Sequence, residues 1–241
     1  MKRYLPFVII AAVAVLTVGA GALFYRAKQR AFASGRVTRL STNEAGAEPL
    51  HVRGQRGAPV TLEEFGDFEC PSCATEAEVI SKLEQDYGPR LSVVWRNFPL
   101  EMHPHALEAA LAAEAAGLQG HFWEMHDLLY KDQPVWSKAL DVHPFFSMYA
   151  RSLHLDVERF GKDSTSDEVR VRVVSDRDEG VSLGVKNTPT LFINHHEVRP
   201  PFSPEHLHEA IDAALAQSTP KAFEADRASP PAKIQPRGDR K

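Results

Sequence analysis

Two cysteines between a strand-like run and a helix constrain the fold of this 241-residue chain more than any other feature. They are its only cysteines, and they occur in Cys70-Pro71-Ser72-Cys73, directly after the strand-like run 60–65. Both sulfurs fall within one helical turn, so their α-carbons can reach the separation that a disulfide requires. Such a disulfide would stabilise the fold little, because loop-closure entropy grows with loop length. We therefore expect a redox-active pair at the start of a helix.

Hydrophobic periodicity predicts an α/β order of elements. The expected strands are 59–66, 91–98 and 190–193, with an edge strand at 197–199. The expected helices are 71–87, 104–118, 121–131, 142–152, 165–183 and 203–216. This order predicts an α/β fold with a helical insertion at about 103–183. The right-handed crossover rule predicts a parallel strand-helix-strand unit over residues 60–98.

The N-terminal segment is expected to meet a membrane. Lys2 and Arg3 precede an uncharged run over 5–25, which is long enough to cross a bilayer as one helix. Residues 1–33 are therefore predicted to be a membrane anchor, with a cleaved signal sequence as the alternative. Both interpretations export the domain. We expect a single-pass protein of the inner or cytoplasmic membrane, with its folded domain on the periplasmic, extracytoplasmic side of the cell envelope.

The rest of the chain divides into a linker, a domain and a tail. Residues 34–57 are polar and are expected to be a flexible linker, whereas 58–217 form the folded domain. Residues 218–241 are rich in proline and charge, and a disordered tail is expected there. The net charge of −4 argues against a nucleic-acid partner.

The two cysteines are expected to differ in chemistry. Cys73 shares a helix face with Ala77, Ile80 and Tyr87, so it should face inward. Cys70 precedes that face, at the helix N-terminus, where free N–H groups favour a thiolate. Cys70 is therefore predicted to be the exposed, attacking sulfur and Cys73 the shielded, resolving one.

A zinc or copper site is the alternative from another class. A Cys-x-x-Cys pair is often half of a zinc site, which needs two further ligands. Because the chain has no other cysteine, such a site would have to recruit His103 or His105. A tethered copper- or zinc-binding module that uses Cys70, Cys73 and one of these histidines stays open on the residues alone.

Four ordered motifs resemble those of DsbA-like thiol:disulfide oxidoreductases over about residues 58–217. They are the segment 60–73 with the dithiol, Asn97-Phe98-Pro99-Leu100 with His103-Pro104, the segment 120–129, and the segment 184–194. The resemblance implies a thioredoxin fold with a helical insertion and electron transfer by the dithiol, with no cofactor and no metal.

The resemblance also gives roles to residues away from the cysteines. Pro189 corresponds to the cis-proline that faces the dithiol, with Thr188 before it. Glu64 corresponds to the acidic residue beneath the site; we expect it to be buried and to exchange the proton of Cys73. Neighbouring Glu63 could be the solvated one. Substrate contacts are implied at Thr188, Pro71 and Ser72.

The expected reaction is disulfide formation in exported polypeptides, followed by reoxidation of the dithiol by a membrane redox partner. An envelope reductase or isomerase would use the same residues in reverse. Pro71 and Ser72 bring no histidine between the cysteines, and Asp67 and Glu69 add negative charge nearby. We therefore expect the pKa of Cys70 to lie below that of a free thiol but above the strongly oxidising extreme of about 3.5.

Overall fold

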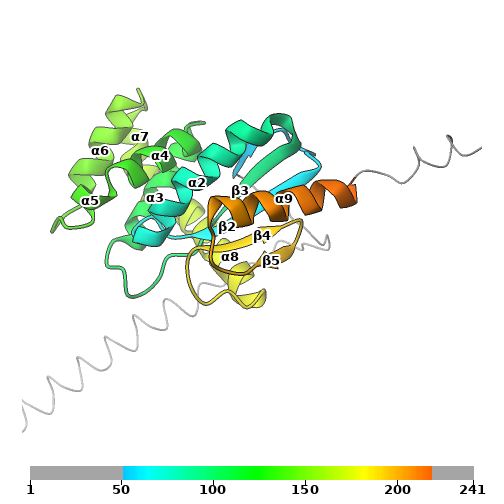
Figure 1. Cartoon of the computed structure of the whole chain (residues 1–241). Coiled ribbons are helices and arrows are strands. Elements are labelled where there is room, and N and C mark those ends of the chain that lie inside the picture. The colour runs from blue at the N-terminus through cyan, green and yellow to red at the C-terminus, as the bar shows by residue number, and fades with distance from the viewer. Residues whose placement is uncertain (1–50, 219–241) are drawn as a thin grey trace, which may run out of the picture. The chain divides into compact units, whose positions relative to one another are not determined.

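The computed structural model describes residues 51–218, which contain one five-stranded sheet (Figure 1). The strands are β1 His51–Gly54, β2 Val60–Gly66, β3 Leu91–Asn97, β4 Thr190–Ile193 and β5 His196–Val198. Their order across the sheet is β1-β3-β2-β4-β5. β2 and β3 are parallel, and every other neighbouring pair is antiparallel. β2 therefore lies at the centre, where both of its edges are hydrogen-bonded.

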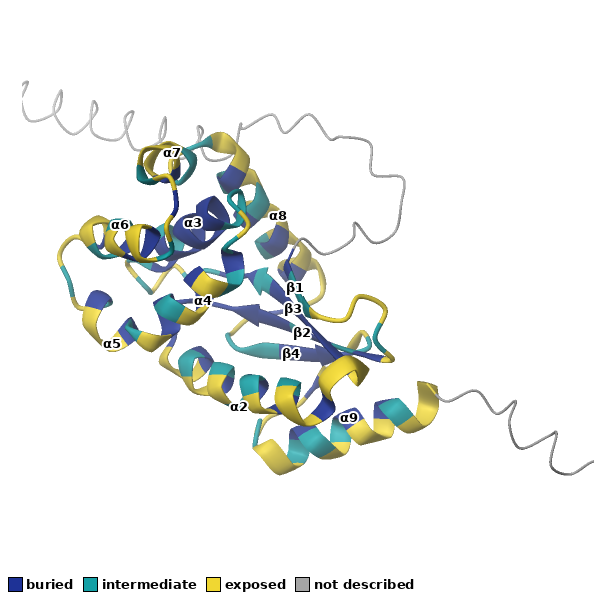
Figure 2. Ribbon diagram, turned by 90° about the horizontal axis from the view of Figure 1, so that it is seen from above, coloured by how far each residue is buried: buried dark blue, intermediate teal, exposed yellow. Residues whose placement is uncertain are grey.

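Helices cover both faces of this sheet. α2 Pro71–Tyr87 and α9 Pro204–Ser218 lie on one face, and α8 Asp167–Ser182 lies on the other (Figure 2). A short 3₁₀ turn, Gly88–Arg90, joins α2 to β3. Between β3 and α8 the chain forms α3 Ala106–Gly117, α4 Phe122–Lys131, α5 Gln133–Trp136, α6 His143–Ser152 and α7 Val157–Asp163. Helices α3 to α7 make up the helical insertion.

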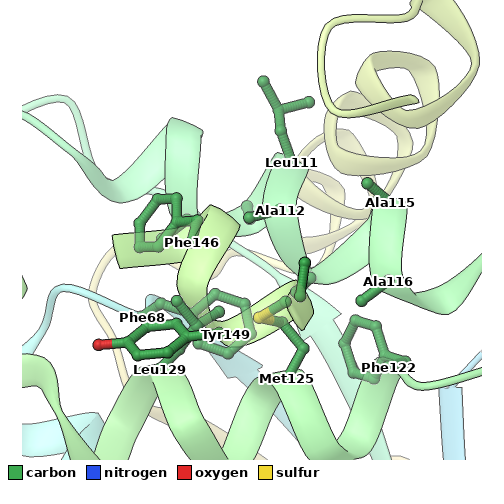
Figure 3. Close-up of a cluster of buried hydrophobic side chains, with 14 of the residues drawn as sticks. Phe68, Leu111, Ala112, Ala115, Ala116, Phe122, Met125, Leu129, Phe146 and Tyr149 are labelled. Carbon is green, nitrogen blue, oxygen red and sulfur yellow. The ribbon is translucent and has the colours of Figure 1, made fainter. Parts of the chain in front are cut away.

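Two apolar clusters stabilise α2 and the turn that precedes it. On the α2 and α9 face, Leu62 packs with Ile80 and Leu207. The second cluster belongs to the insertion and includes Phe68, from the turn between β2 and α2 (Figure 3). Phe68 is 1% exposed and stacks on Trp95, with ring centroids 4.7 Å apart. The turn is thus anchored between the sheet and the insertion.

The predicted order of elements is confirmed for the long elements. α2 spans the predicted residues, and the parallel pairing of β2 with β3 confirms the strand-helix-strand unit. The short helices α5 and α7 were not predicted. The prediction of a linker at 34–57 is wrong for β1, which lies within it and pairs with β3. A four-residue strand has too few positions for a periodic signal, and its partner is distant in sequence.

The predicted membrane helix at 5–25 lies outside the described residues, as does the predicted tail after its first residue, Ser218, which ends α9. Within 51–218, no helix is long and apolar enough to cross a membrane.

Candidate active site

The dithiol lies at the first turn of α2, as the sequence predicted. Cys70 is the N-cap residue and Pro71 the first helical residue, a position where proline costs no hydrogen bond. The Cys70 N–H donates to the Asp67 carbonyl at 3.1 Å, which closes the turn after β2. The sulfur of Cys70 therefore lies at the positive end of the α2 dipole.

The two sulfurs differ in burial less than expected. Both cysteines are free thiols; Cys73 has no exposed surface and Cys70 retains 6%. The prediction of an inward-facing Cys73 is confirmed. The prediction of an exposed Cys70 is wrong, because the loop before β4 covers it: in the thiol form, Cys70 Sγ donates to the Thr188 carbonyl at 3.4 Å. Cys70 is still the more accessible of the two sulfurs.

The pKa values of the two thiols move in opposite directions. The pKa of Cys70 is lowered to about 5, chiefly by a hydrogen bond from the Cys73 side chain, although burial opposes the shift. The Thr188 side chain and the backbone N–H groups of Cys73 and Ser72 lower it further. Burial raises the pKa of Cys73 well above its usual value, and the charge of Glu64 adds to this. At neutral pH the reduced site therefore holds one thiolate, on Cys70.

The loop before β4 faces the dithiol. The Thr188–Pro189 peptide bond is cis, as the resemblance implied. The Thr188 hydroxyl oxygen is buried without a hydrogen-bond partner, so it is free to donate to a thiolate on Cys70. Pro71 and Ser72 are exposed at the start of α2.

Glu64 lies on β2 and is 2% exposed, so its predicted burial is confirmed. Burial raises the pKa of Glu64 well above its usual value, and the charges of Glu76 and Cys70 raise it further. Its neighbour Glu63 is half-buried and pairs with Arg96 at 2.8 Å, so it is not the solvated residue that we expected. Glu76, a second buried acid on α2, was not predicted.

Further polar side chains hold the turn before the dithiol, and the sequence did not reveal these contacts. The buried Asp67 carboxylate accepts from the N–H of Glu69 and of Leu100, each at 2.8 Å, and lies 2.8 Å from His103 Nδ1. From α5, Gln133 Nε2 donates to the carbonyls of Phe68 at 2.8 Å and Cys70 at 3.0 Å.

The histidines proposed as metal ligands are engaged elsewhere. His103 contacts Asp67, and His105 Nε2 lies 3.0 Å from the Ala139 carbonyl oxygen. Among residues 51–218, no group of three or more His, Cys, Asp or Glu side chains is placed to hold a metal ion. His103 and His105 thus each have a partner other than the two cysteines.

The thioredoxin family model matches residues 47–213. A thioredoxin-like oxidoreductase from Silicibacter pomeroyi is 26% identical, with a TM-score of 0.60 over 69% of this chain and 93% of that one. DsbA2 from Pseudomonas aeruginosa is 25% identical, with a TM-score of 0.56 over 70% and 96%. The Na⁺/H⁺ antiporter NhaA 1 of Mycolicibacterium gilvum is 42% identical over 168 residues. That alignment covers 68% of this chain but 26% of the antiporter.

A dithiol at a helix start, opposite a cis-proline loop and between a sheet and a helical insertion, defines a thioredoxin-fold redox protein. The chain belongs to the thioredoxin family, in its DsbA-like branch, and is a thiol-disulfide oxidoreductase.

Proposed function

We propose that the protein forms disulfides in exported polypeptides. The observation that carries this proposal is the opposite displacement of the two thiol pKa values, with Cys70 at about 5. A sulfur of low pKa is a good leaving group, and stabilising its thiolate stabilises the reduced protein. The oxidised protein is then the stronger electron acceptor.

The proposed reaction begins with the disulfide form. A substrate thiolate attacks Cys70 Sγ, so a bond forms between the substrate sulfur and Cys70 Sγ while the Cys70–Cys73 bond breaks. Cys73 takes the released electron pair and then a proton, for which the buried carboxyl of Glu64 is the proposed donor. A second substrate thiolate attacks the first substrate sulfur, and Cys70 leaves as a thiolate. Two electrons pass from the substrate to the dithiol.

Substrate contact is proposed at the rim of the dithiol. Pro71 and Ser72 are exposed next to Cys70, and the Thr188 carbonyl lies on its other side. A polypeptide that brings a thiolate to Cys70 passes between these groups.

The proposed location is the outer side of a membrane in the cell envelope, with residues 1–33 as anchor and a membrane redox partner that reoxidises the dithiol. The apolar run 5–25 supports the anchor. The similarity to part of a Na⁺/H⁺ antiporter supports a place beside a membrane, although the chain spans about a quarter of that relative. Accessibility of Cys70 to a membrane-impermeant thiol reagent in intact cells tests this location.

A trapping experiment tests the reaction. In a Cys73→Ala variant, Cys70 can still attack a disulfide of an exported protein, one sulfur of which leaves as a thiolate. The resulting mixed disulfide cannot resolve within the protein, so covalent adducts of Cys70 should accumulate. Cys70→Ala is the control and should trap none. Equal recovery of adducts from the two variants, or none from either, would contradict the proposal.

The reduction potential of the dithiol tests the direction of electron flow. Equilibration with glutathione should place the potential between about −120 mV, the value for DsbA, and about −270 mV, that for thioredoxin. In the cell the dithiol should be found mainly as a disulfide. A dithiol that stays reduced in the cell would point to the reductase instead.

A further inference from the structure

A second buried carboxyl group, that of Glu76, lies near the dithiol, at a position in α2 where an apolar side chain would be expected. The buried side of α2 carries Cys73, Glu76, Ile80, Leu83 and Tyr87 at alternating steps of three and four. The facing side of β2 carries Val60, Leu62 and Glu64. In these two opposed stripes, the only acids are Glu64 and Glu76. Glu76 follows Cys73 by one helical turn, so both carboxyls lie at the dithiol end of the α2–β2 interface.

Both carboxyls are buried and incompletely paired. Glu64 is 2% exposed and Glu76 is 5% exposed, and the Oε1 atom of each is buried without a hydrogen-bond partner. Burial raises the pKa of Glu76 to about 7. Since the charge of Glu76 also raises the pKa of Glu64, the two groups interact across the interface. Two interacting acids lose their protons in two steps that belong to the pair.

We propose that Glu64 and Glu76 form one proton-holding pair for Cys73, in which Glu76 is a positioning residue that sets the pH at which Glu64 accepts the proton. The proposal deepens the function proposed above, because it rests on dithiol exchange and on Glu64 as the group that exchanges the proton of Cys73. Glu76 acts through Glu64 and has no assigned contact with the substrate.

The step in question follows formation of a mixed disulfide between Cys70 and a partner. Cys73 gives its proton to the Glu64 carboxylate, and Cys73 Sγ attacks Cys70 Sγ. The Cys70–Cys73 bond forms, and the bond from Cys70 to the partner sulfur breaks. The partner leaves as a thiolate with the electron pair of that bond, so the dithiol has lost two electrons.

The other titratable groups around the pair come from the turn, α2 and α4. They are Asp67, Cys70, Cys73, Tyr130 and His126, whose ring centroid lies 5.0 Å from that of Tyr130. Burial lowers the pKa of His126, so this side chain is neutral at neutral pH. Burial raises the pKa of Tyr130 well above its usual value, and the charges of Cys73 and Glu64 raise it further. Tyr130 therefore stays neutral, and Cys70 has no titrating thiol while it is bonded to the partner sulfur. A change near neutral pH in the rate at which the mixed disulfide decays would then report the titration of the carboxyl pair.

The test uses Glu76→Gln and Glu76→Leu in the full chain, with Glu78→Gln as the control. Glu78 is exposed on the same helix, and its substitution makes the same chemical change. Reduced protein is mixed with oxidised glutathione, and the decay of the mixed disulfide is followed by rapid quenching across a pH series. Removing the Glu76 charge should lower the pKa of Glu64, so the midpoint of the rate profile should move down by about 1 pH unit. Glu78→Gln should leave it in place.

A double variant separates the pair from a general effect of charge. In a Glu64→Gln background, Glu76→Gln should cause no further shift of the midpoint. An unmoved midpoint in the single variants, or a shift that persists without Glu64, would overturn the pair. If one substitution at Glu76 does not fold, the other carries the test, since glutamine keeps the shape and leucine suits the apolar stripe. A wild-type protein that forms no mixed disulfide would instead contradict dithiol exchange itself.

Discussion

At the scale of single residues, the chemistry depends on an asymmetry between two sulfurs one helical turn apart. Their positions on α2 account for part of it, because Cys70 caps the helix and Cys73 faces inward. This part was predictable from the sequence. Thr188, which is 118 positions away in the sequence, adds to this asymmetry, and no spacing rule places it against Cys70. Its role was implied by the resemblance, and its contact with Cys70 by the structure.

Replacing Thr188 should weaken the Cys70 thiolate. Thr188→Val keeps the branched shape but removes a hydroxyl that lowers the pKa of Cys70. We expect that pKa to rise from about 5 by about 1 unit, which corresponds to roughly 30 mV toward a more reducing potential. Ultraviolet absorbance of the thiolate against pH measures the shift. Thr165→Val, in the exposed end of the insertion, is the control; an equal shift there would contradict the assignment.

The buried acid at Glu76 should make stability depend on pH. Its pKa is raised to about 7 in the folded protein, from 4.5. Below about pH 4.5 the Glu76 carboxyl is protonated in both the folded and the unfolded protein, so its burial does not lower the stability. Between the two pKa values the unfolded chain loses this proton first, so the stability falls as the pH rises. Glu76→Gln should abolish this fall, so its stability relative to wild type should improve by roughly 2 kcal/mol between about pH 4 and about pH 8. Urea unfolding of the reduced proteins measures it; a constant difference would contradict the burial cost.

At the scale of elements, the helical insertion holds the active-site turn as well as covering it. Gln133, at the start of α5, donates to two carbonyls of that turn, and Tyr130 on α4 donates to the Asp67 carbonyl at 3.3 Å. Without Gln133 the Phe68 carbonyl of this buried turn would lack a partner, whereas the Asp67 and Cys70 carbonyls also accept from the N–H groups of Cys70 and Ala74. Periodicity predicted α4, but α5 is a single turn, and nothing in its sequence marks Gln133 as a donor to a segment more than 60 residues away.

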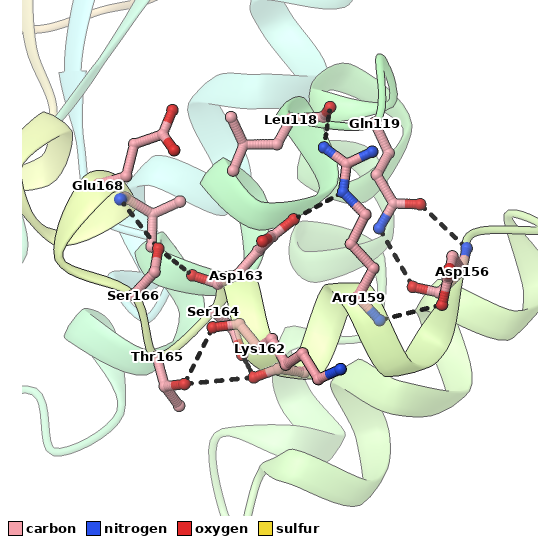
Figure 4. A network of polar contacts seen from close by, with 12 residues as sticks. Leu118, Gln119, Asp156, Arg159, Lys162, Asp163, Ser164, Thr165, Ser166 and Glu168 are labelled. Atoms are coloured by element: carbon pink, nitrogen blue, oxygen red, sulfur yellow. Dashed lines mark hydrogen bonds and ion pairs between the residues drawn. The ribbon is translucent and has the colours of Figure 1, made fainter.

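The Gln133 contact should contribute measurably to stability. Gln133→Leu leaves the Phe68 carbonyl buried without its donor, and we expect a loss of about 2 kcal/mol in the free energy of unfolding. Gln119→Leu is a matched control, because Gln119 also makes two hydrogen bonds to the backbone, both to Asp156 on the exposed side of the insertion (Figure 4). Its loss should cost less than about 1 kcal/mol, since water can replace it. Similar losses of stability in the two variants would contradict this role of Gln133 in holding the turn.

At the scale of the whole molecule, the sequence predicted what depends on periodicity and missed what depends on distant pairing. The long helices and the central strands carry repeating apolar positions, and they were predicted within a few residues. Glu64 was predicted to be buried because it shares a strand face with Leu62. Glu76 was missed because an acid in a buried helical stripe contradicts the usual pattern. β1 was missed because only its contacts with β3 and the insertion make it a strand.

The N-terminal boundary of the folded unit should therefore lie before β1 and not at residue 58. His51 stacks on Phe122, with ring centroids 3.4 Å apart, and its Nε2 lies 2.8 Å from the fully buried Glu114. A chain that starts at residue 58 loses both contacts and leaves the edge of β3 unpaired, so we expect it to be at least about 3 kcal/mol less stable than one that starts at residue 47. Denaturant unfolding of the two chains measures the difference. His51→Ala in the longer chain should reproduce part of the loss, because Glu114 then keeps its burial without this partner. Equal stability of the two chains would mean that β1 merely lies along the sheet, and that residues 51–57 are the linker that their polar sequence predicted.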